Sequence, residues 1–198
     1  SVIIINYNAK ELLKQCLASV QKAVDGIRHE IIIVDNNSGD GSRPYLGEIS
    51  NQVKIYLLKE NVGFAKACNL GLKNSSGEFV LFLNPDTLLP PDCFEKCLSF
   101  FDKTAQAGAI GVRMTDGNGK FLKESKRGFP SPATSFFKLF GFAKLFPHSK
   151  IFAAYYAGHL PEKETNSVDV LSGALMMIRK KVLEETGGID ETFFMFGE

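Results

Sequence analysis

The sequence predicts an α/β fold in which a mostly parallel sheet is flanked by helices, and three observations lead to that prediction. Short apolar runs alternate with amphipathic stretches over the first half of the chain. The connections between them are short, which favours parallel strands with helices on both faces of the sheet. A length of 198 residues, with 44% hydrophobic and 23% charged residues, fits one ordinary α/β domain and excludes disorder or a coiled coil.

The strands of the first half are short apolar runs that end in polar loops, and they are expected at residues 2–5, 31–34, 53–58 and 79–83. An amphipathic helix follows the first run, because its apolar residues recur at helical spacing: Leu12, Leu13, Cys16, Leu17 and Val20. Further helices are expected over residues 64–73 and from about Pro91, since proline is favoured in a first helical turn.

The pattern changes after Gly108. A strand is expected at residues 109–112, a basic, proline-bearing stretch at 123–132, and an apolar stretch with interleaved lysines at 135–146. Residues 168–178 predict a strand interrupted by Ser172 and Gly173, and residues 180–186 predict a short helix closed by two glycines. We find no internal repeat and no low-complexity segment.

Composition excludes several classes of protein. Lys and Arg number 23 against 22 Asp and Glu, a formal net charge of +1, which argues against a nucleic-acid-binding domain. No stretch reaches the roughly 18 apolar residues that a membrane-spanning helix needs. The four cysteines are too few and too scattered for a disulfide scaffold, which favours reduced thiols in a cytosolic protein.

We expect both ends of the sequence to lie within a longer chain. The first residue leads directly into the first apolar run, and the last residues follow an aromatic cluster at 193–196 with no polar tail. We therefore expect part of the function to depend on residues outside this sequence.

Polar side chains gather where three of the expected strands end. They are Asn6 and Asn8 after the first, Asp35 and Asn37 after the second, and Asn84 and Asp86 after the fourth. Because ligands of open α/β sheets bind at the carboxyl ends of the strands, this convergence predicts a binding cleft.

Three common ligand motifs of such sheets are absent. The first strand is not followed by Gly-x-Gly-x-x-Gly, and the chain contains neither Gly-x-x-x-x-Gly-Lys-Ser/Thr nor Gly-x-Ser-x-Gly. These absences argue against dinucleotide-binding, P-loop ATPase and hydrolase sites respectively.

The strand-end residues each have two interpretations. Asp35 can accept hydrogen bonds from a nucleobase or a ribose hydroxyl, or form an Asx-type turn. Asp86, in Asn84-Pro85-Asp86, can hold a divalent cation on a nucleotide diphosphate, or close a type I turn. The loop before residue 64 can be an anion or sugar loop at a helix N-terminus, or a plain connection.

Cysteine and histidine give weaker signals. Cys93 and Cys97 lie four apart on an expected helix, but no second Cys or His pair completes a zinc site, so core packing is favoured. His29, His148 and His159 lie in unrelated contexts without a visible nucleophile.

Two segments of the second half have open interpretations. Residues 135–146 can touch a membrane surface or a lipid-linked substrate, form a buried helix, or act as a lid. Lys123, Lys126 and Arg127 can steer a phosphate-bearing acceptor, or form a solvated basic loop.

The order of these segments resembles the family 2 glycosyltransferases, and within them the bacterial rhamnosyltransferase-like branch. The similar blocks are residues 2–8 (VIIINYN), 34–38 (VDNNS), 61–65 (NVGFA) with Asn69, and 82–86 (FLNPD). Residues 169–174 (DVLSGA) and 187–195 (GGIDETFFM) also fit. The resemblance implies a GT-A fold with one mixed sheet, a nucleotide-sugar-binding half at residues 1–107 and an acceptor-binding half at 108–198.

The resemblance also implies roles for single residues. The nucleotide and its sugar would be bound by Asn6, Tyr7, Asn8, Asp35, Asn37, Gly63, Phe64, Asn69, Asn84 and Asp86. Asp86 matches the last carboxylate of the family's Asp-x-Asp motif and would bind Mn²⁺ or Mg²⁺, whereas Asn84 replaces the first carboxylate and adds no charge. The acceptor side would include Ser172, Gly173 and Ala174.

The implied reaction is an inverting transfer of a sugar from a dTDP- or UDP-linked donor to a saccharide or lipid-linked acceptor. A divalent ion would stabilise the leaving diphosphate, and a carboxylate would take the proton of the acceptor hydroxyl. The family's base lies in a Glu-Asp pair, of which Glu198 matches the Glu. The sequence ends before the Asp, so we expect these residues alone to lack the catalytic base.

The expected setting is bacterial surface polysaccharide synthesis in the cytoplasm, with possible peripheral contact to the inner face of the membrane and no nucleic-acid partner. The alternative is a non-catalytic nucleotide-sugar or carbohydrate-binding module. The sequence argues against a third class, the sugar-1-phosphate nucleotidyltransferases, because the Gly-rich loop that such enzymes carry near the first strand is absent here. The residues do not determine the donor sugar, the acceptor or the oligomeric state.

Overall fold

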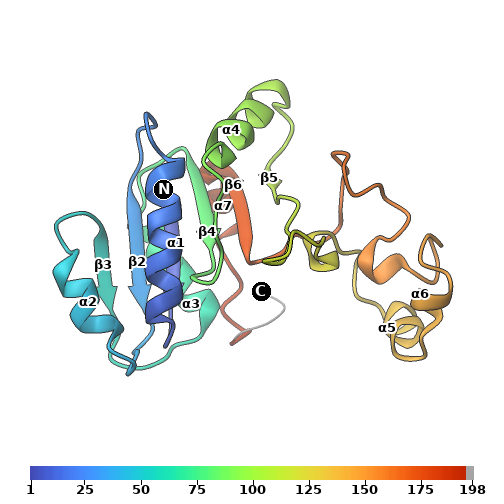
Figure 1. Ribbon diagram of the computed structural model, residues 1–198, viewed down its shortest axis with the longest axis horizontal. Coiled ribbons are helices and arrows are strands. Elements are labelled where there is room, and N and C mark those ends of the chain that lie inside the picture. Colours follow the sequence, from blue (N-terminus) through green and yellow to red (C-terminus); the bar gives the residue numbers. More distant parts are fainter. Residues whose placement is uncertain (195–198) are drawn as a thin grey trace. The chain divides into compact units, whose positions relative to one another are not determined.

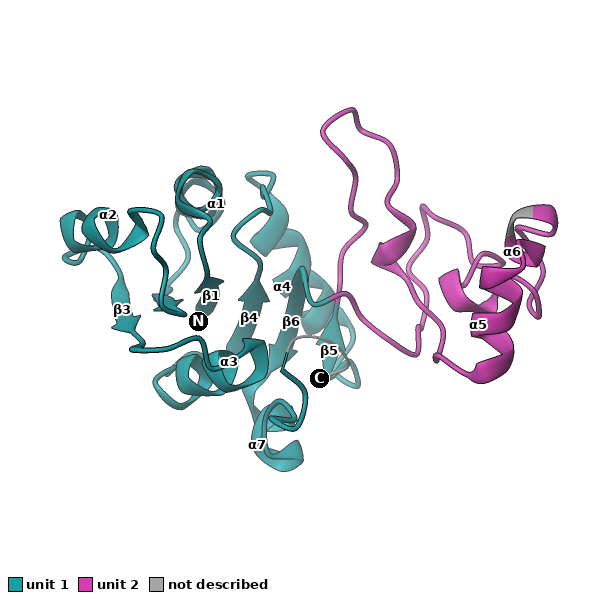
Figure 2. Ribbon diagram, turned by 90° about the horizontal axis from the view of Figure 1, so that it is seen from below, with its two compact units in different colours: residues 1–110, 173–198 teal, residues 111–172 magenta. Residues whose placement is uncertain are grey.

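The computed structural model describes residues 1–194, apart from the side chain of residue 144, and divides the chain into two compact units (Figure 2). Unit 1 comprises Ser1–Ile110 and Gly173–Glu198, and unit 2 comprises Gly111–Ser172. The chain therefore leaves unit 1 after its first 110 residues and returns to it for the last sheet strand. The assignment of residues 1–107 to the donor and 108–198 to the acceptor stays a prediction.

Unit 1 is built on a six-stranded mixed sheet of order β3-β2-β1-β4-β6-β5 (Figure 1). Strands β1 to β4 run parallel, and β6 is antiparallel to both β4 and β5. The sequence prediction of a mostly parallel sheet flanked by helices is confirmed. The strands are β1 Val2–Asn6, β2 Ile31–Asp35, β3 Lys54–Leu57, β4 Phe79–Leu83, β5 Ala109–Ile110 and β6 Leu175–Arg179.

Helices cover both faces of this sheet: α1 and α2 lie on one face, and α3 and α7 on the other (Figure 2). The amphipathic spacing predicted for the first helix is confirmed for Leu13, Cys16, Leu17 and Val20 of α1, which are buried. Leu12, expected on the same face, is instead 47% exposed. The helices of unit 1 are α1 Lys10–Ala23, α2 Ser42–Glu48, α3 Phe64–Lys73, α4 Cys93–Lys103 and α7 Lys180–Thr186.

The core between the sheet and α3 is packed closely enough to require a glycine. Ile3 and Ile5 of β1 contribute to this core, with Ala67 and Cys68 of α3 against the sheet. A Cβ atom on Gly71 of α3 would lie 2.5 Å from Cγ2 of Ile3, too close for any side chain. Gly71 therefore lets the helix approach β1 more closely than alanine would.

Three element predictions need correction. The strands expected at 53–58 and 109–112 are shorter, at Lys54–Leu57 and Ala109–Ile110. The strand expected at 168–178 begins only at Leu175, because Val170 pairs with Arg127 of unit 2 while the sheet strand belongs to unit 1. Helix α2 was not anticipated, because its seven residues bury only Ser42 and Leu46 and show no helical period.

Unit 2 contains two short helices, α5 Pro132–Leu139 and α6 Phe142–Leu145, with 3₁₀ turns at Lys123–Ser125 and Ala154–Tyr156. Ser131 begins α5 through a capping box with Thr134, and Pro132 occupies the first turn. Gly141, at φ +79°, separates the two helices. The stretch 135–146 is not a buried helix, since its large apolar side chains are mostly exposed. No helix in residues 1–194 is long and apolar enough to span a bilayer.

Candidate functional site

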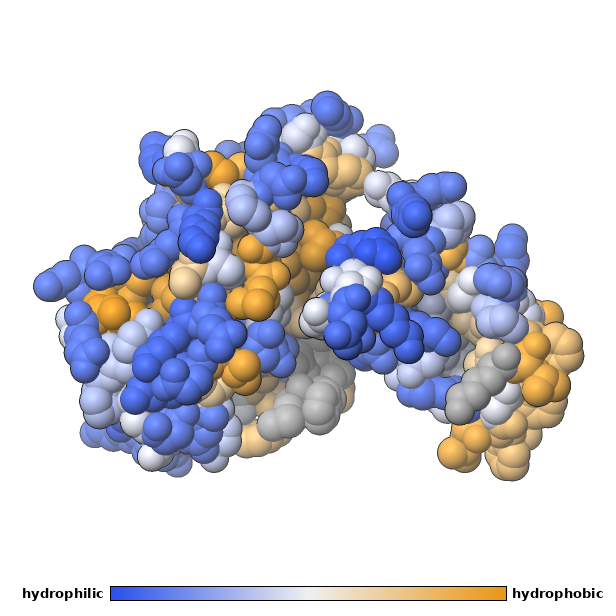
Figure 3. Space-filling model, viewed as in Figure 1, coloured by the Kyte–Doolittle hydropathy of each residue, from blue (hydrophilic) through white to orange (hydrophobic). Residues whose placement is uncertain are grey.

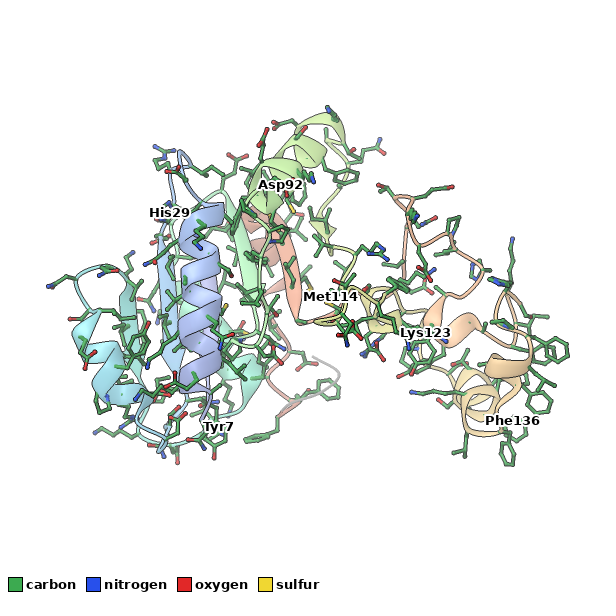
Figure 4. All side chains as sticks on the ribbon, viewed as in Figure 1. Tyr7, His29, Asp92, Met114, Lys123 and Phe136 are labelled. Carbon is green, nitrogen blue, oxygen red and sulfur yellow. The ribbon has the colours of Figure 1, made fainter. Side chains whose placement is uncertain are left out.

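The carboxyl ends of β1 and β2 bring together the first two predicted site residues. Asn6 and Asp35 are the last register partners of the two strands, and both are fully buried. Tyr7 follows at this edge of the sheet, whereas His29 lies at the opposite edge (Figure 4). The polar groups that end β1 and β2 therefore lie together, as predicted, and His29 lies away from them (Figure 4).

A hydrogen-bond network fixes Asp35. Nδ2 of Asn6 donates to Oδ1 of Asp35 at 2.9 Å and to Oγ of Ser38 at 3.0 Å. The other carboxylate oxygen, Oδ2, accepts from the backbone N–H of Ser38 and from Nε of Arg43, both at 3.0 Å. Burial disfavours the charged form, but these donors outweigh it and lower the pKa of Asp35 below its ordinary value. Asp35 is thus an ionised carboxylate at neutral pH.

Asn6 carries an unsatisfied acceptor at the same place. Its Oδ1 is buried and has no hydrogen-bond partner among the described residues. Buried polar atoms normally have partners, and leaving one unpaired is unfavourable. The network therefore leaves one buried acceptor unsatisfied beside an ionised carboxylate.

The loops after β1 and β2 are tied to each other. The backbone N–H of Asn8 donates to Oγ of Ser38 at 3.0 Å, and the N–H of Gly39 donates to Oδ1 of Asn8 at 2.7 Å. Asn8 and Asn37 both adopt positive φ angles, of 52° and 66°, which asparagine tolerates better than most residues. With Tyr7 they form the exposed rim above the buried Asn6–Asp35 pair.

The loop at 61–63 is held by a second asparagine pair. Nδ2 of Asn36 donates to Oδ1 of Asn61 at 2.7 Å, and Oδ1 of Asn36 accepts from the backbone N–H of Val62 at 2.9 Å. Gly63, at φ +88°, must be glycine because a Cβ there would lie 2.5 Å from the carbonyl oxygen of Phe194. These contacts hold the loop at the same edge of the sheet.

Helix α3 begins at this loop, and its first residues are engaged within unit 1. The backbone N–H of Phe64 donates to the carbonyl of Phe194 at 2.8 Å. Asn69 donates to the carbonyl of Ile189 and to Glu191, each at 2.8 Å. These contacts connect α3 to the segment after α7. Donor binding by Gly63, Phe64 and Asn69 stays a prediction.

The Asn84-Pro85-Asp86 segment follows β4, which pairs with β1 on the side opposite β2. The segment forms a turn, closed by a hydrogen bond of 3.2 Å from the N–H of Thr87 to the carbonyl of Asn84. The backbone N–H of Asn84 donates to the carbonyl of Ala174 at 3.0 Å, so the residues before β6 support this turn. The turn is present, and the side chain of Asp86 is exposed, so metal binding by Asp86 stays a prediction.

Cys16 of α1 lies behind the turn. Its Sγ donates to the carbonyl of Asn84 at 3.6 Å. Burial, with a smaller effect of the Asp86 charge, raises the pKa of the Cys16 thiol to about 12. The thiol is therefore protonated and unreactive at neutral pH.

The residues around Asp86 are too few to bind a metal ion by themselves. They fit a site in which the ion is also bound by a phosphate-bearing ligand. Within residues 1–194 no three His, Cys, Asp or Glu side chains lie close enough to form a metal site. Asp86 provides one exposed carboxylate and Asn84 one amide oxygen. Mg²⁺ is commonly bound through one or two carboxylates together with substrate phosphates, so this donor set is sufficient only when a diphosphate is present.

The remaining candidates divide into three groups. Gly173 and Ala174 precede β6 in unit 1, and Ser172 ends unit 2, so their acceptor role stays a prediction. Glu198 lies outside the described residues. Cys93 and Cys97 are buried in the core as favoured.

The basic loop of unit 2 is not uniformly solvated. Nζ of Lys126 donates to the carbonyl of Leu160, and burial lowers the pKa of Lys126. Lys123 is exposed. The phosphate-steering interpretation therefore fits Lys123 better than Lys126.

Sequence reasoning missed three residues of the network. Ser38 and Asn36 lie in the Asn/Ser/Gly loop after β2, where burial of a polar residue has no sequence signal. Arg43 lies eight residues after Asp35 on α2, and only the fold brings its guanidinium to the carboxylate.

The chain belongs to glycosyl transferase family 2: the model of that family matches residues 1–187. The L-rhamnosyltransferase of Mycobacterium tuberculosis named for N-acetylglucosaminyl-diphospho-decaprenol is 26% identical over 208 residues, which covers all of this chain and 66% of that protein. The hexosyltransferase Agl10 of Haloferax volcanii, named for low-salt glycan biosynthesis, is 28% identical and is covered to 58% of its length. The minor teichoic acid biosynthesis protein GgaB of Bacillus subtilis is 33% identical over 52% of this chain and 12% of its own length.

Solved structures share the fold. The structure of Staphylococcus aureus TarS 1–349 has a TM-score of 0.64 at 21% identity and covers 96% of this chain and 50% of its own. The mannosyltransferase PcManGT of Pyrobaculum calidifontis, in complex with GDP-Man and Mn²⁺, has a TM-score of 0.61 and covers 96% of this chain and 47% of its own. The predicted GT-A fold is confirmed. The chain spans half or less of these structures and, at most, about two thirds of the relatives above.

Proposed function

We propose that the edge of the sheet around Asn6 and Asp35 binds the base of a UDP- or dTDP-linked sugar. The single observation that carries this proposal is the unpartnered, buried Oδ1 of Asn6 beside the ionised Asp35. Uracil and thymine each present one ring N–H, which is the donor that such an acceptor pair needs. Structures of S. aureus TarS with UDP and with UDP-GlcNAc support this type of donor.

The diphosphate of the donor would extend toward Asp86 at the end of the neighbouring β4. Asp86 and Asn84 would hold Mn²⁺ or Mg²⁺ together with the phosphate oxygens. When bound, the ion supplies electrostatic stabilisation of the leaving diphosphate. The PcManGT complex, which contains GDP-Man and Mn²⁺, supports the same combination of donor and ion.

The reaction would be an inverting transfer, in which an acceptor hydroxyl attacks the anomeric carbon directly. The hydroxyl has a high pKa, so a carboxylate must take its proton during the attack. Glu198 matches the Glu of the family's Glu-Asp pair, and the base would be an Asp that follows it. Ser172, Gly173 and Ala174 would border the acceptor.

The acceptor would be a saccharide or a lipid-linked saccharide in bacterial surface polysaccharide synthesis. The names of two relatives support this class: the M. tuberculosis enzyme is named for a decaprenol-linked sugar, and the B. subtilis protein for teichoic acid biosynthesis. The protein would then work in the cytoplasm at the inner face of the membrane. Exposed Lys123 could attract the phosphates of such an acceptor.

Calorimetric titration with UDP and dTDP, each with and without Mn²⁺, tests the donor site directly. We expect micromolar binding that depends on the metal. Asp86→Asn should weaken metal-dependent binding by about tenfold or more, the loss common for residues that support a metal. Asp102→Asn is the matched control, since Asp102 is an exposed aspartate on α4. If neither nucleotide binds, even to a longer chain that includes the residues after Glu198, the proposal is refuted.

Donor hydrolysis and sugar transfer separate an enzyme from a non-catalytic binding module. The longer chain should release UDP or dTDP from the nucleotide sugar, and release should increase with a suitable acceptor. Nucleotide binding without any turnover in the longer chain would favour the binding module.

A further inference from the structure

The two short helices of unit 2 expose a continuous set of large apolar side chains, which we call the apolar face. It consists of Phe136, Leu139, Phe140, Phe142, Leu145 and Phe146, whose exposed fractions range from 37% to 81%. Hydrophobic surface gathers over this end of unit 2 in the space-filling view (Figure 3). A contiguous apolar patch of this kind on a protein surface commonly marks an interaction site.

The apolar face comes from one five-residue pattern that occurs twice, a local duplication much shorter than the structural repeats that the chain lacks. Residues 136–140 and 142–146 both read Phe-x-Lys-Leu-Phe, and Gly141 separates them. The apolar residues of each copy stand at positions i, i+3 and i+4, which share one side of a helix. Gly141 ends α5 at φ +79° and starts α6, so each copy forms its own helical turn.

Helices α5 and α6 and the segment that follows them have a small core of their own beneath the apolar face. The ring of Phe152 lies 4.9 Å from that of Phe137 and 5.7 Å from that of Phe142, measured between centroids. Ala153 and Ala157 are buried beside it. A Cβ on Gly158 would collide with the carbonyl of Pro147, so the backbone here is closely packed. The exposed side chains are therefore additional to a formed core.

The charged residues of the segment that carries the apolar face have a single sign. Residues 129–160 include lysines at 138, 144 and 150 and histidines at 148 and 159, but no Asp or Glu. The ammonium of Lys138 lies 3.9 Å from the ring centroid of Tyr155, and both Lys138 and Lys150 are exposed. Apolar and aromatic side chains with lysines alone match a membrane surface that contains anionic lipids.

We propose that the apolar face and its lysines dock unit 2 on the surface of an anionic lipid bilayer. The phenylalanine and leucine side chains enter the interface between headgroups and acyl chains, and the lysines contact anionic headgroups. Docking of this face on a second copy is disfavoured, because a two-fold contact would bring lysines of like charge together. The proposal rests on this surface alone and is independent of nucleotide binding.

The chain contains no tryptophan, so one introduced indole reports its own surroundings. Phe140→Trp places it on the apolar face, and Leu88→Trp is the matched control on unit 1, because both native side chains are 63% exposed. With phosphatidylglycerol/phosphatidylcholine vesicles, the emission of Phe140→Trp should shift to the blue and be quenched by brominated lipids. Leu88→Trp should show neither effect. Absence of a shift in Phe140→Trp would overturn the proposal.

Vesicle co-sedimentation of the tryptophan-free chain measures the two parts of the surface separately. Leu139→Ser and Leu145→Ser should each weaken binding by about tenfold, and Leu88→Ser should not. Lys150→Gln should weaken binding to anionic vesicles by about fivefold, and added salt should weaken it further. If the Phe140→Trp shift instead grows with protein concentration in the absence of lipid, the face joins copies of the chain and the membrane proposal is wrong.

Discussion

The ion pair between Arg43 and Asp35 should couple α2 to the candidate base-binding edge of the sheet. Nε of Arg43 lies 3.0 Å from Oδ2 of the fully buried Asp35, and the guanidinium also donates to the carbonyl of Leu58. Breaking a fully buried pair costs about 3–5 kcal/mol. Because the Arg43 side chain is 35% exposed, water recovers part of that loss, and we expect about 2 kcal/mol for Arg43→Met.

Asp35→Asn should also destabilise unit 1, by a mechanism that follows from the geometry. Oδ2 of Asp35 faces two donors and Oδ1 faces Nδ2 of Asn6. If the amide oxygen takes the position of Oδ2, its NH₂ points at the Asn6 amide and one buried hydrogen bond is lost. In the opposite orientation the NH₂ faces the donors of Ser38 and Arg43, and two are lost.

A double-mutant cycle of Arg43→Met and Asp35→Asn, measured by urea unfolding at neutral pH, should give a coupling of about 1–2 kcal/mol. The pair Lys181–Glu185 is the control cycle, because its atoms are 3.7 Å apart and both side chains are largely exposed, and it should show no measurable coupling. A coupling below about 0.5 kcal/mol for Arg43 and Asp35 would refute the reasoning, since distant sites that do not interact deviate from additivity by up to about that value.

The same variants have a defined pH dependence. The folded-state pKa of Asp35 is lowered, so its contribution to stability is complete above the ordinary carboxyl pKa of about 3.9 and is lost as pH falls through the folded value. Asp35→Asn should remove this part of the acid dependence. An unchanged acid profile in the variant would mean that other carboxylates dominate it.

Three further outcomes are expected. Burial of Glu30 is outweighed by hydrogen bonds from Lys54 and two serines, which lower the pKa of Glu30. Glu30→Gln should therefore lower the free energy of unfolding at neutral pH, and the difference from wild type should vanish as pH falls through the folded pKa of Glu30. A difference that does not change with pH would contradict this. Gly71→Ala should lower the free energy of unfolding in urea by about 1–3 kcal/mol, because the added Cβ would lie 2.5 Å from the Ile3 side chain. This loss should exceed the gain from the better helix propensity of alanine. A more stable variant would mean that β1 and α3 can move apart at little cost. Cys16 should resist alkylation by iodoacetamide at pH 8 until the chain is unfolded, because burial raises the pKa of its thiol to about 12. Mass spectrometry of peptides locates the labelled cysteine. Rapid labelling of Cys16 in the native chain would show that the thiol is accessible.

Local patterns were sufficient for much of the fold. Four apolar runs predicted β1 to β4, and the helical spacing around Cys16 predicted α1, because burial of a strand or of one helix face imposes a period on the sequence. The short helix α2 and the late start of β6 at Leu175 were not predictable in this way. The first is too short to show a period, and the second depends on where the chain returns from unit 2 to the sheet.

The sequence by itself determined the α/β class, the order of the strand-end polar groups and the family resemblance, since all three are properties of local patterns along the chain. Only the tertiary structure decided how those groups are used. It brought the hydrogen-bond donors of Ser38 and Arg43 to Asp35, and it exposed most of the large apolar side chains of residues 135–146. It also left Oδ1 of Asn6 without a partner among the described residues. Hydrogen bonds between residues on different elements, and the burial that strengthens them, arise only when the chain has folded, because no spacing along the sequence sets the distance between them.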